Sequence, residues 1–312
     1  MRVSSSTFPD SFIYQTNQLE NQQNTLQSEA TTGLNFTQPG DDPAGMTQAL
    51  ELQADSSSNT QYQSNITQLQ DSATTSYDAL NGLQTLISQA STIAAGVDGA
   101  TSTTELSTDA TEIGGIIQQA LQLANTQDSN GNYIFGGTNE STPPFTASTD
   151  GDGNVTGVTY QGNTSVAQAE IAPGVTVSAQ TLGANTTGTG PRGLITDSRY
   201  GADLFNHLIS LQNDLTSGNV SAVSTTDAQN LSHDENNIAY QVGSNGVVQS
   251  TLTNTNSVAT QQGTNLTTQM SNLTSANLAT TLTQLQQTET SYQAALQSGV
   301  QVMQISLLNY LY

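Results

Sequence analysis

The chain has 312 residues, of which 9% are charged, and its three arginines oppose 25 acidic side chains to give a formal net charge of −22. Nucleic acids and anionic membrane surfaces attract proteins through clustered Lys and Arg, so this balance argues against both as partners. Cysteine is absent, which excludes disulfides, thiolate metal sites and a cysteine nucleophile.

The N-terminal segment carries a sparse heptad repeat. Phe12, Leu19 and Leu26 recur every seven residues and are followed by Gly33, while the positions between them are mostly Gln, Glu and Asn. So thin an apolar stripe predicts a helix that is weak alone and becomes ordered when neighbouring subunits surround it. We therefore expect residues 1–40 to be an assembly helix that is disordered in the isolated molecule.

The sequence Asp41-Asp42-Pro43 predicts the start of a helix. Pro43 suits the first helical turn, and a carboxylate at Asp42 can accept hydrogen bonds from the free amide groups there. A plain N-cap explains these residues without any further role. The alternative is that Asp41, Asp42 and Pro43 also contact a neighbouring subunit.

Residues 41–139 carry two helical stripes and are expected to form the first half of a helical bundle. In each stripe the positions return at alternating intervals of three and four, which is the spacing of a coiled coil. The short connection at 96–99 favours antiparallel packing. The first stripe is Ile66, Leu69, Ala73, Ser76, Leu80, Leu83, Ile87, Ala90 and Ala94, and the second is Leu106, Ala110, Ile113, Ile117, Ala120 and Ala124.

Between about 145 and 180 the pattern changes to short β-rich runs. Residues such as Val155 and Tyr160 stand among Gly, Asn and Asp, which favour tight turns. We expect a β-rich insert domain at 140–200, with a Gly/Thr-rich loop at 183–193.

Helical spacing resumes near Ala202, so residues 201–275 are expected to form the second half of the bundle. The apolar positions are Leu204, Leu208, Leu211 and Leu215, followed by Val248, Leu252, Ala259, Leu266 and Leu273.

Residues 276–312 carry one more regular stripe. Its positions are Leu278, Leu282, Leu285, Glu289, Tyr292, Leu296, Gly299, Met303 and Ser306, of which six are apolar. Burying six such side chains yields roughly 9–18 kcal/mol, whereas ordering roughly 29 residues costs on the order of 1.5 kcal/mol each. An ordinary core helix is one alternative, but this comparison favours an assembly helix that is disordered in the isolated molecule. The expected interface residues are Leu282, Leu285, Tyr292, Leu296, Met303, Leu307 and Leu308.

The motifs do not predict a catalytic, cofactor or metal site. Gly188–Gly193 fits Gly-x-Gly-x-x-Gly, but Pro191 removes an amide donor that a phosphate would use. Asp128 and Asp150 begin runs that lack the Gly and Glu of a calcium loop, so both predict turns. The two histidines have no metal-ligand spacing, and we expect His207 to be solvent-facing or partly packed.

Three segments resemble one family. Residues 31–45, Thr-Thr-Gly-Leu-Asn-Phe-Thr-Gln-Pro-Gly-Asp-Asp-Pro-Ala-Gly, are similar to a signature of bacterial flagellin-like proteins. Residues 125–137, Asn-Thr-Gln-Asp-Ser-Asn-Gly-Asn-Tyr-Ile-Phe-Gly-Gly, resemble a stretch typical of the flagellar hook-associated protein 3 family. Residues 293–296 and 306–311 resemble the ending that this family shares with flagellin. At Leu34-Asn35 and at Asn277 onwards the chain lacks the charged residues of the family, so no family salt bridge is carried over.

The resemblance implies a mainly α fold, in which both termini pair as an antiparallel helical bundle and coiled coil and a small β-rich insert faces outward. It implies a structural adaptor, not an enzyme, at the hook–filament junction outside the cell. The implied route is export through the flagellar type III channel, which agrees with the lack of a secretory signal in the first 30 residues. The implied partners are sibling subunits, hook-associated protein 1 below, flagellin above and an export chaperone, and no cofactor is implied.

Two alternatives stay open. The terminal motifs are shared with flagellin, so the first alternative is the filament subunit itself. The second is a secreted adhesin or enzyme that acts through the β-rich insert.

Overall fold

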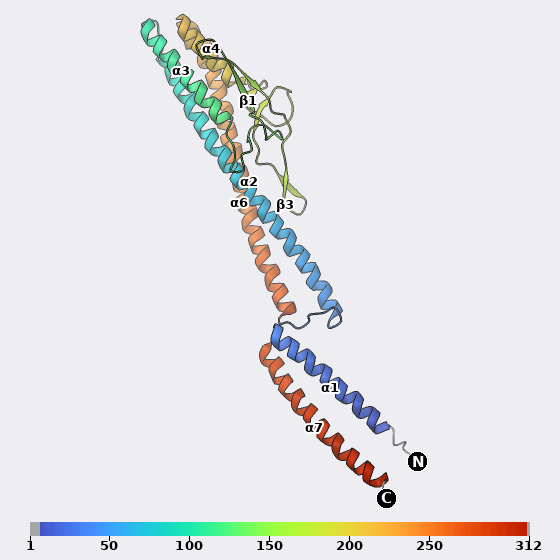
Figure 1. The fold of residues 1–312 in the computed structure, drawn as a ribbon. Coiled ribbons are helices and arrows are strands. Elements are labelled where there is room, and N and C mark those ends of the chain that lie inside the picture. Colours follow the sequence, from blue (N-terminus) through green and yellow to red (C-terminus); the bar gives the residue numbers. More distant parts are fainter. Residues whose placement is uncertain (1–6, 311–312) are drawn as a thin grey trace. The chain divides into compact units, whose positions relative to one another are not determined.

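The computed structural model describes residues 7–310, with side chains described for residues 10–302. The chain is mainly α-helical with a small set of strands in its middle (Figure 1), as the sequence predicts. The described residues form two compact units, one up to Ser58 and from Gln262 onwards, and the other comprising Asn59–Gln261. The helices are α1 (Thr7–Thr32), α2 (Pro43–Gly96), α3 (Thr103–Ala124), α4 (Leu204–Ser217), the short α5 (Val220–Ala222), the π-helix η1 (Val223–Asp227), α6 (Ala228–Thr274) and α7 (Leu278–Tyr310).

The two stripes predicted for the first half of the bundle are confirmed in α2 and α3. Every position of the second stripe is buried, and in the first stripe only Leu69 is half-buried. A capping box fixes the start of α3. The Ser102 hydroxyl accepts a hydrogen bond from the Glu105 amide at 3.2 Å, while the Ser102 amide donates to the Glu105 carboxylate at 2.9 Å. Two amide groups that lack helical partners are satisfied in this way.

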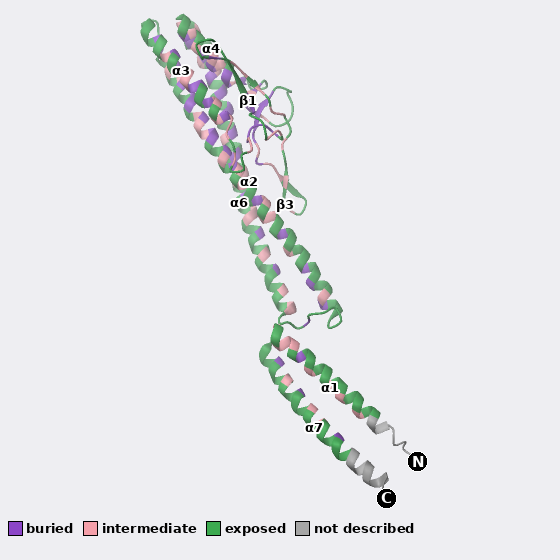
Figure 2. Cartoon of the chain, in the orientation of Figure 1, coloured by how far each residue is buried: buried purple, intermediate pink, exposed green. Residues whose placement is uncertain are grey.

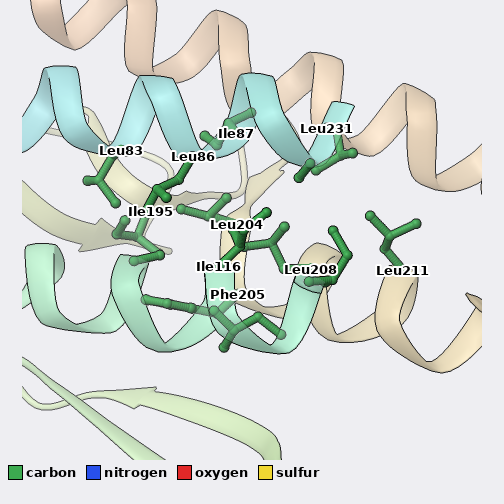
Figure 3. Packing of buried hydrophobic residues seen from close by; sticks show 14 of the residues in the cluster. Leu83, Leu86, Ile87, Ile116, Ile195, Leu204, Phe205, Leu208, Leu211 and Leu231 are labelled. Carbon is green, nitrogen blue, oxygen red and sulfur yellow. The ribbon is translucent and has the colours of Figure 1, made fainter. Parts of the chain in front are cut away.

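The hydrophobic core of the Asn59–Gln261 unit forms where α2, α3, α4 and α6 meet the strands. The predicted α4 positions Leu204, Leu208 and Leu211 are each at most 1% exposed. Figure 3 shows Ile87 of α2 and Ile195 lying close to this α4 face. Because each fully buried aliphatic side chain contributes roughly 1.5–3 kcal/mol, this cluster is the main source of stability in the unit.

Seven short strands lie between α3 and α4. They are β1 (Phe145–Thr149), β2 (Val155–Tyr160), β3 (Ala169–Ala172), β4 (Val175–Val177), β5 (Leu182–Asn185), β6 (Gly193–Asp197) and β7 (Ala202–Asp203). Four of them form two antiparallel pairs, β1 with β2 and β3 with β4. The remaining three form a sheet in which β6 pairs parallel to β5 and antiparallel to β7.

The loop predicted at 183–193 is shorter than the sequence suggested, because its first residues belong to the buried strand β5. Glycine is a poor strand former, so Gly183 gave no strand signal. Its backbone amide donates to the Phe135 carbonyl oxygen at 2.9 Å, and an added Cβ atom would lie 2.7 Å from the same oxygen. Tertiary contact therefore selects a strand where the local sequence favours a turn.

The apolar stripe predicted in α6 is confirmed. Leu252, Ala259 and Leu266 are buried, and Val248 and Leu273 are half-buried. None of the described helices combines the length and apolar character needed to cross a membrane.

Two pairs of amide side chains connect α2 and α6. In each pair, residues one turn apart on one helix donate hydrogen bonds to a single alanine carbonyl oxygen on the other helix. The pairs are Asn59 and Gln63 with Ala259, at 2.9 and 3.1 Å, and Asn245 and Gln249 with Ala73, at 3.0 and 3.5 Å. A carbonyl oxygen has a second lone pair available for such a bond. Because sliding one helix along the other would break these bonds, they fix the register of the pair.

Candidate assembly surface on the terminal helices

The two ends of the chain form one helix pair, with α1 and α7 side by side and antiparallel (Figure 1). Figure 2 shows both helices mostly exposed, with buried positions spaced along them. On α1 the least exposed side carries the predicted heptad. Leu26 is buried, whereas Phe12 and Leu19 are half-buried. The stripe between the helices is therefore as thin as the sequence suggests.

Near the N-terminal end of α1 the pair is closely packed. The Phe12 ring lies against Gly299 of α7, where an added Cβ atom would come within 2.7 and 2.8 Å of two ring carbons. Near the other end, the Thr281 hydroxyl lies 3.5 Å from a carboxylate oxygen of Glu29. These contacts place the start of one helix beside the end of the other.

The least exposed row of α7 agrees with the predicted stripe at Leu285, Tyr292 and Gly299 and differs from it at other positions. The least exposed positions are Thr281, Leu285, Thr288, Tyr292, Ala295 and Gly299. The predicted positions Leu282 and Leu296 are 51% and 42% exposed, and Leu278 is 47% exposed. At 100° per residue these leucines lie roughly 60–100° around the helix from the buried row. The small residues Thr281, Thr288 and Gly299 allow a close approach to α1. Leu278, Leu282 and Leu296 are left on the flank.

Three predicted interface residues cannot be placed in the same way. Met303, Leu307 and Leu308 belong to α7, but their side chains lie outside the described residues.

A short backbone contact connects the segments that follow α1 and precede α7. The Asn35 amide donates to the Thr274 carbonyl at 2.7 Å, and the Ala276 amide donates to the Gly33 carbonyl at 2.8 Å. Gly33 has a φ angle of 71°, a backbone conformation that glycine adopts without strain. The glycine thus turns the chain out of α1 and accepts the bond that holds it beside α7.

Asp42 caps α2, as the sequence predicts. Its carboxylate accepts hydrogen bonds from the amides of Ala44 and Gly45 at 3.1 and 2.9 Å, and Pro43 occupies the first helical position. Asp41 has a separate local role, because its carboxylate accepts the amides of Thr37 and Gln38 at 3.1 and 3.0 Å. Both acids are exposed, so their other oxygen lone pairs can meet a neighbour.

The Asn59–Gln261 unit contains buried acidic groups that the sequence did not reveal. His207 Nδ1 lies 2.7 Å from Oδ2 of Asp234, and Oδ1 of Asp234 accepts a hydrogen bond from the Asp203 backbone amide at 2.9 Å. Burial opposes protonation of His207, but the hydrogen bond and charge of Asp234 raise its pKa. Asp227 closes η1, accepts the Ser210 hydroxyl at 3.1 Å, and is buried. Burial raises the pKa of Asp227 to about 6.

Neither these acidic groups nor the Gly188–Gly193 loop has the geometry of a metal or nucleotide site. Among residues 7–310, no three metal-ligating side chains converge. In the Gly188–Gly193 loop the carbonyl oxygens of Thr189 and Pro191 accept hydrogen bonds from the side-chain amide of Asn185 at 2.7 and 2.6 Å. These bonds hold the loop against strand β5, which contains Asn185.

The runs that resembled calcium loops are turns, as predicted. The Asp150 carboxylate accepts hydrogen bonds from Asn154, which lowers the pKa of Asp150. Burial opposes the same change at Asp128, yet bonds from the Asn132 and Asn130 amides lower its pKa. Each carboxylate is thus occupied by its own turn.

Comparison with known proteins finds similarity over parts of the chain. Residues 11–140 match the family described as the bacterial flagellin N-terminal helical region. The chain is 34% identical over 118 residues to flagellar hook-associated protein 3 of Escherichia coli K12, covering 38% of this chain and 37% of that protein. It is 33% identical over 128 residues to the protein of the same name from Salmonella typhimurium, covering 40% of each. The chain thus matches about two fifths of the length of these curated relatives.

Solved structures extend the likeness in fold. A provisionally named flagellar hook-associated protein from Vibrio parahaemolyticus superposes with a TM-score of 0.64 at 19% identity, over 75% of this chain and all of the other. FlgL from Bacillus cereus gives a TM-score of 0.55 at 20% identity, over 71% of this chain and 99% of the other. At such identities the likeness establishes the helical fold with its small strand-containing insert.

Proposed function

We propose that this chain is a member of the bacterial flagellin-like family, which its partial likenesses support, and that it is a structural adaptor subunit of the flagellum that joins the hook to the filament. The observation that carries the proposal is the pairing of both chain ends in the α1–α7 helix pair, whose buried stripe is thin. The names of its curated relatives support the same position in the flagellum.

In the proposed mechanism, neighbouring subunits bury the exposed apolar side chains of the terminal helices during assembly. The α1–α7 pair buries only a thin stripe of side chains and leaves Leu278, Leu282 and Leu296 exposed on one flank of α7. Water-exposed leucines gain roughly 1.5–3 kcal/mol each when a neighbour buries them. In this proposal many copies crowd together, cover these leucines and order the terminal helices. The residues proposed for these contacts are Phe12, Leu19, Leu26, Asp41, Asp42, Pro43, Leu282, Leu285, Tyr292, Leu296, Met303, Leu307 and Leu308.

The proposed partners follow from the adaptor position. Sibling subunits lie beside the chain, hook-associated protein 1 lies below it, and flagellin lies above it. Export through the flagellar type III system with a dedicated chaperone brings it outside the cell. The role is structural and not enzymatic, which agrees with aspartate side chains that serve as caps, turns and buried pairs.

The proposal is tested by deleting the gene and examining the cells by electron microscopy. We expect hooks without attached filaments, and recovery of filaments when the full chain is supplied again. Normal filaments in the deletion strain would contradict the proposal. Long filaments formed by the pure protein alone would instead identify it as flagellin.

Deleting residues 145–180 separates the adaptor from an adhesin or enzyme that acts through the strands. An adaptor still assembles without this segment, whereas an adhesin or enzyme loses its activity.

A further inference from the structure

Arg192 is unusual in a chain so poor in positive charge. Of the two arginines that the structure describes, Arg199 forms an ion pair with Asp197, with 2.6 Å between Nη2 and Oδ2. Arg192 makes no ion pair within residues 7–310. Its Nε–H donates to the Asn237 side-chain oxygen, and the Nη edge of its guanidinium has no hydrogen-bond partner among the described residues. This edge is therefore available to an anion.

Two tyrosines hold the Arg192 side chain in place. Its Cζ atom lies 3.6 Å from the ring centroid of Tyr200 and 4.4 Å from that of Tyr240. The rings come from the segment between β6 and β7 and from α6, and they are 46% and 53% exposed. Cation–π contacts with two rings, together with the Nε hydrogen bond, restrict the side chain before any ligand arrives. A ligand at the Nη edge then needs little further ordering of Arg192.

A small polar cavity of about 200 Å³ lies beside Arg192 and Tyr240. The residues that line it include Gln180, Gln241 and Ser244. Pockets for small-molecule ligands usually measure roughly 300–1,000 Å³. The cavity is therefore suited to one amino-acid side chain presented by another protein surface.

The exposed surface continues from Tyr240 along α6. Val247 and Val258 are 67% and 68% exposed, and their spacing of seven and eleven residues places all three on one side of the helix. No Asp, Glu, Lys or Arg occurs between Glu235 and Glu289. In a molecule with a net charge of −22, this face has no carboxylates to repel another acidic surface.

We propose that Arg192, Tyr200, Tyr240 and the outer face of α6 as far as Val258 dock a second copy of this chain, and that Arg192 binds a carboxylate of that copy. The occupant follows from charge complementarity, because every copy brings 25 acidic side chains and this surface offers an unpaired guanidinium beside a stretch of α6 that carries no acid from Asn236 to Val258. Tyr and Arg are also the residues enriched where protein interfaces carry most of their energy. The inference rests on the proposed function, which places sibling subunits side by side.

The geometry of this contact has a consequence for assembly. The face of α6 that docks the neighbour carries no acid, so the carboxylate that reaches Arg192 comes from a different patch of the other copy. Such a contact joins two unlike surfaces. Contacts of this kind repeat from one copy to the next and build rings or helical arrays.

The test is site-specific photo-crosslinking in assembled flagella. A photoreactive phenylalanine analogue replaces Tyr240 in the full chain, and a matched control carries it at Tyr77, an exposed tyrosine of α2 in the same unit. We expect a crosslinked dimer from position 240, in which the captured peptide of the second copy contains Asp or Glu. Position 77 should give no such dimer.

Charge variants of the crosslinkable chain then test the role of Arg192. Arg192→Gln should lower the yield of dimer about tenfold, the scale of one charge-assisted hydrogen bond, whereas Arg192→Lys should keep part of it because the charge remains. Since Arg192 also bonds Asn237, thermal unfolding checks that both variants fold. Val247→Asp, at an exposed position, provides a second variant that should abolish the dimer by repulsion.

The outcomes separate this inference from the proposed function. Capture of a different protein, no capture, or a yield that Arg192→Gln leaves unchanged overturns the docking proposal while the chain remains a flagellar component. Absence of the chain from purified flagella overturns both.

Discussion

The aromatic ring of Phe12 fills the space left by the missing side chain of Gly299. The two residues lie near opposite ends of the chain, and an added Cβ atom at Gly299 would come within 2.8 Å of the ring. Glycine inside a helix costs roughly 0.5–1 kcal/mol relative to alanine. Packing of the Phe12 ring therefore explains why a glycine stands in the buried row of α7.

Gly299→Ala should impair assembly although alanine is the better helix former. The added methyl group displaces the Phe12 ring and separates α1 from α7, so fewer cells should carry attached filaments. The thermal unfolding midpoint of the isolated chain should not fall, because its main core lies in the Asn59–Gln261 unit. Electron microscopy of complemented deletion cells measures the effect.

Gly115→Ala in α3 is the matched control, because nothing lies within 4 Å of a Cβ atom there. It should leave assembly intact. The combination of Gly299→Ala with Phe12→Ala should recover part of the loss. Equal assembly by Gly299→Ala and the wild type would refute the packing explanation.

Asn245→Ala should destabilise the Asn59–Gln261 unit by breaking one of the amide pairs between α2 and α6. Asn245 donates to the Ala73 carbonyl at 3.0 Å and accepts a hydrogen bond from Gln249 at 2.7 Å. Losing both bonds should lower the free energy of unfolding by about 1–2 kcal/mol. Urea denaturation provides the measurement. The exposed Asn254→Ala supplies the same gain in helix propensity without these bonds, and an identical result for both variants would argue against the amide pairs.

Asp227 should make the isolated chain more stable in mild acid than at neutral pH. Burial, reinforced by the nearby Asp214, raises its pKa to about 6, above the value of about 3.9 in an unfolded chain. Its contribution to stability is then fully present below about pH 4 and is lost as the pH rises through about 6. The loss is at most about 3 kcal/mol, at roughly 1.4 kcal/mol for each pKa unit.

His207 adds to the same trend, because its raised pKa means stability that is present below about pH 6.5 and lost at higher pH. Below about pH 4 the stability of the folded chain should instead fall as the pH falls. Burial opposes ionisation of Asp197, but hydrogen bonds from Arg199 lower its pKa, so its contribution is lost as the pH falls below about 4.

Thermal unfolding between pH 3 and 8 should therefore show its highest midpoint between about pH 4 and 6. Asp227→Asn should raise the midpoint at pH 7 and flatten the profile above pH 5. Asp71→Asn removes an equal charge from an exposed position and controls for general repulsion. A wild-type midpoint that rises steadily from pH 5 to 8 would contradict the assignment.

Regular spacing of strongly apolar residues explains which elements could be predicted from the sequence. The stripes from Ile66 to Ala94 and from Leu106 to Ala124 repeat over many turns, so the helices and their buried faces were evident. On α7 the pattern predicts Leu285, Tyr292 and Gly299 of the least exposed row but not Thr281 and Thr288, because threonine carries no apolar signal in such a pattern. Their small size, which permits close approach of α1, is visible only when the partner helix is in place.

The buried polar groups lay beyond prediction for another reason. Asp234 and Asn237 sit one turn apart on α6, yet their partners are His207 on α4 and the β6 carbonyls of Gly193 and Leu194. The Arg192 surface likewise needs α6 and the strand region together. Residues that are far apart in the sequence cannot be identified as partners from a local sequence pattern.

Leu285→Asp and Leu282→Asp should both block assembly and leave the Asn59–Gln261 unit folded. Leu285 is half-buried on the row that faces α1, while Leu282 is exposed on the flank. A charge at either place becomes buried and unpaired when neighbours close over the helix. Gln284→Asp introduces the same charge at an exposed polar position and should be tolerated. Normal filament attachment by Leu282→Asp would exclude the flank from subunit contacts.

Hydrogen–deuterium exchange of the chain, isolated and within purified flagella, tests most directly whether neighbouring subunits complete the terminal helices. We predict that α1 and α7 exchange within seconds in the isolated chain, while the buried parts of α2 and α3 stay protected, and that all four helices are protected in flagella. Slow exchange along α1 and α7 in the isolated chain, or no added protection in flagella, would contradict this account.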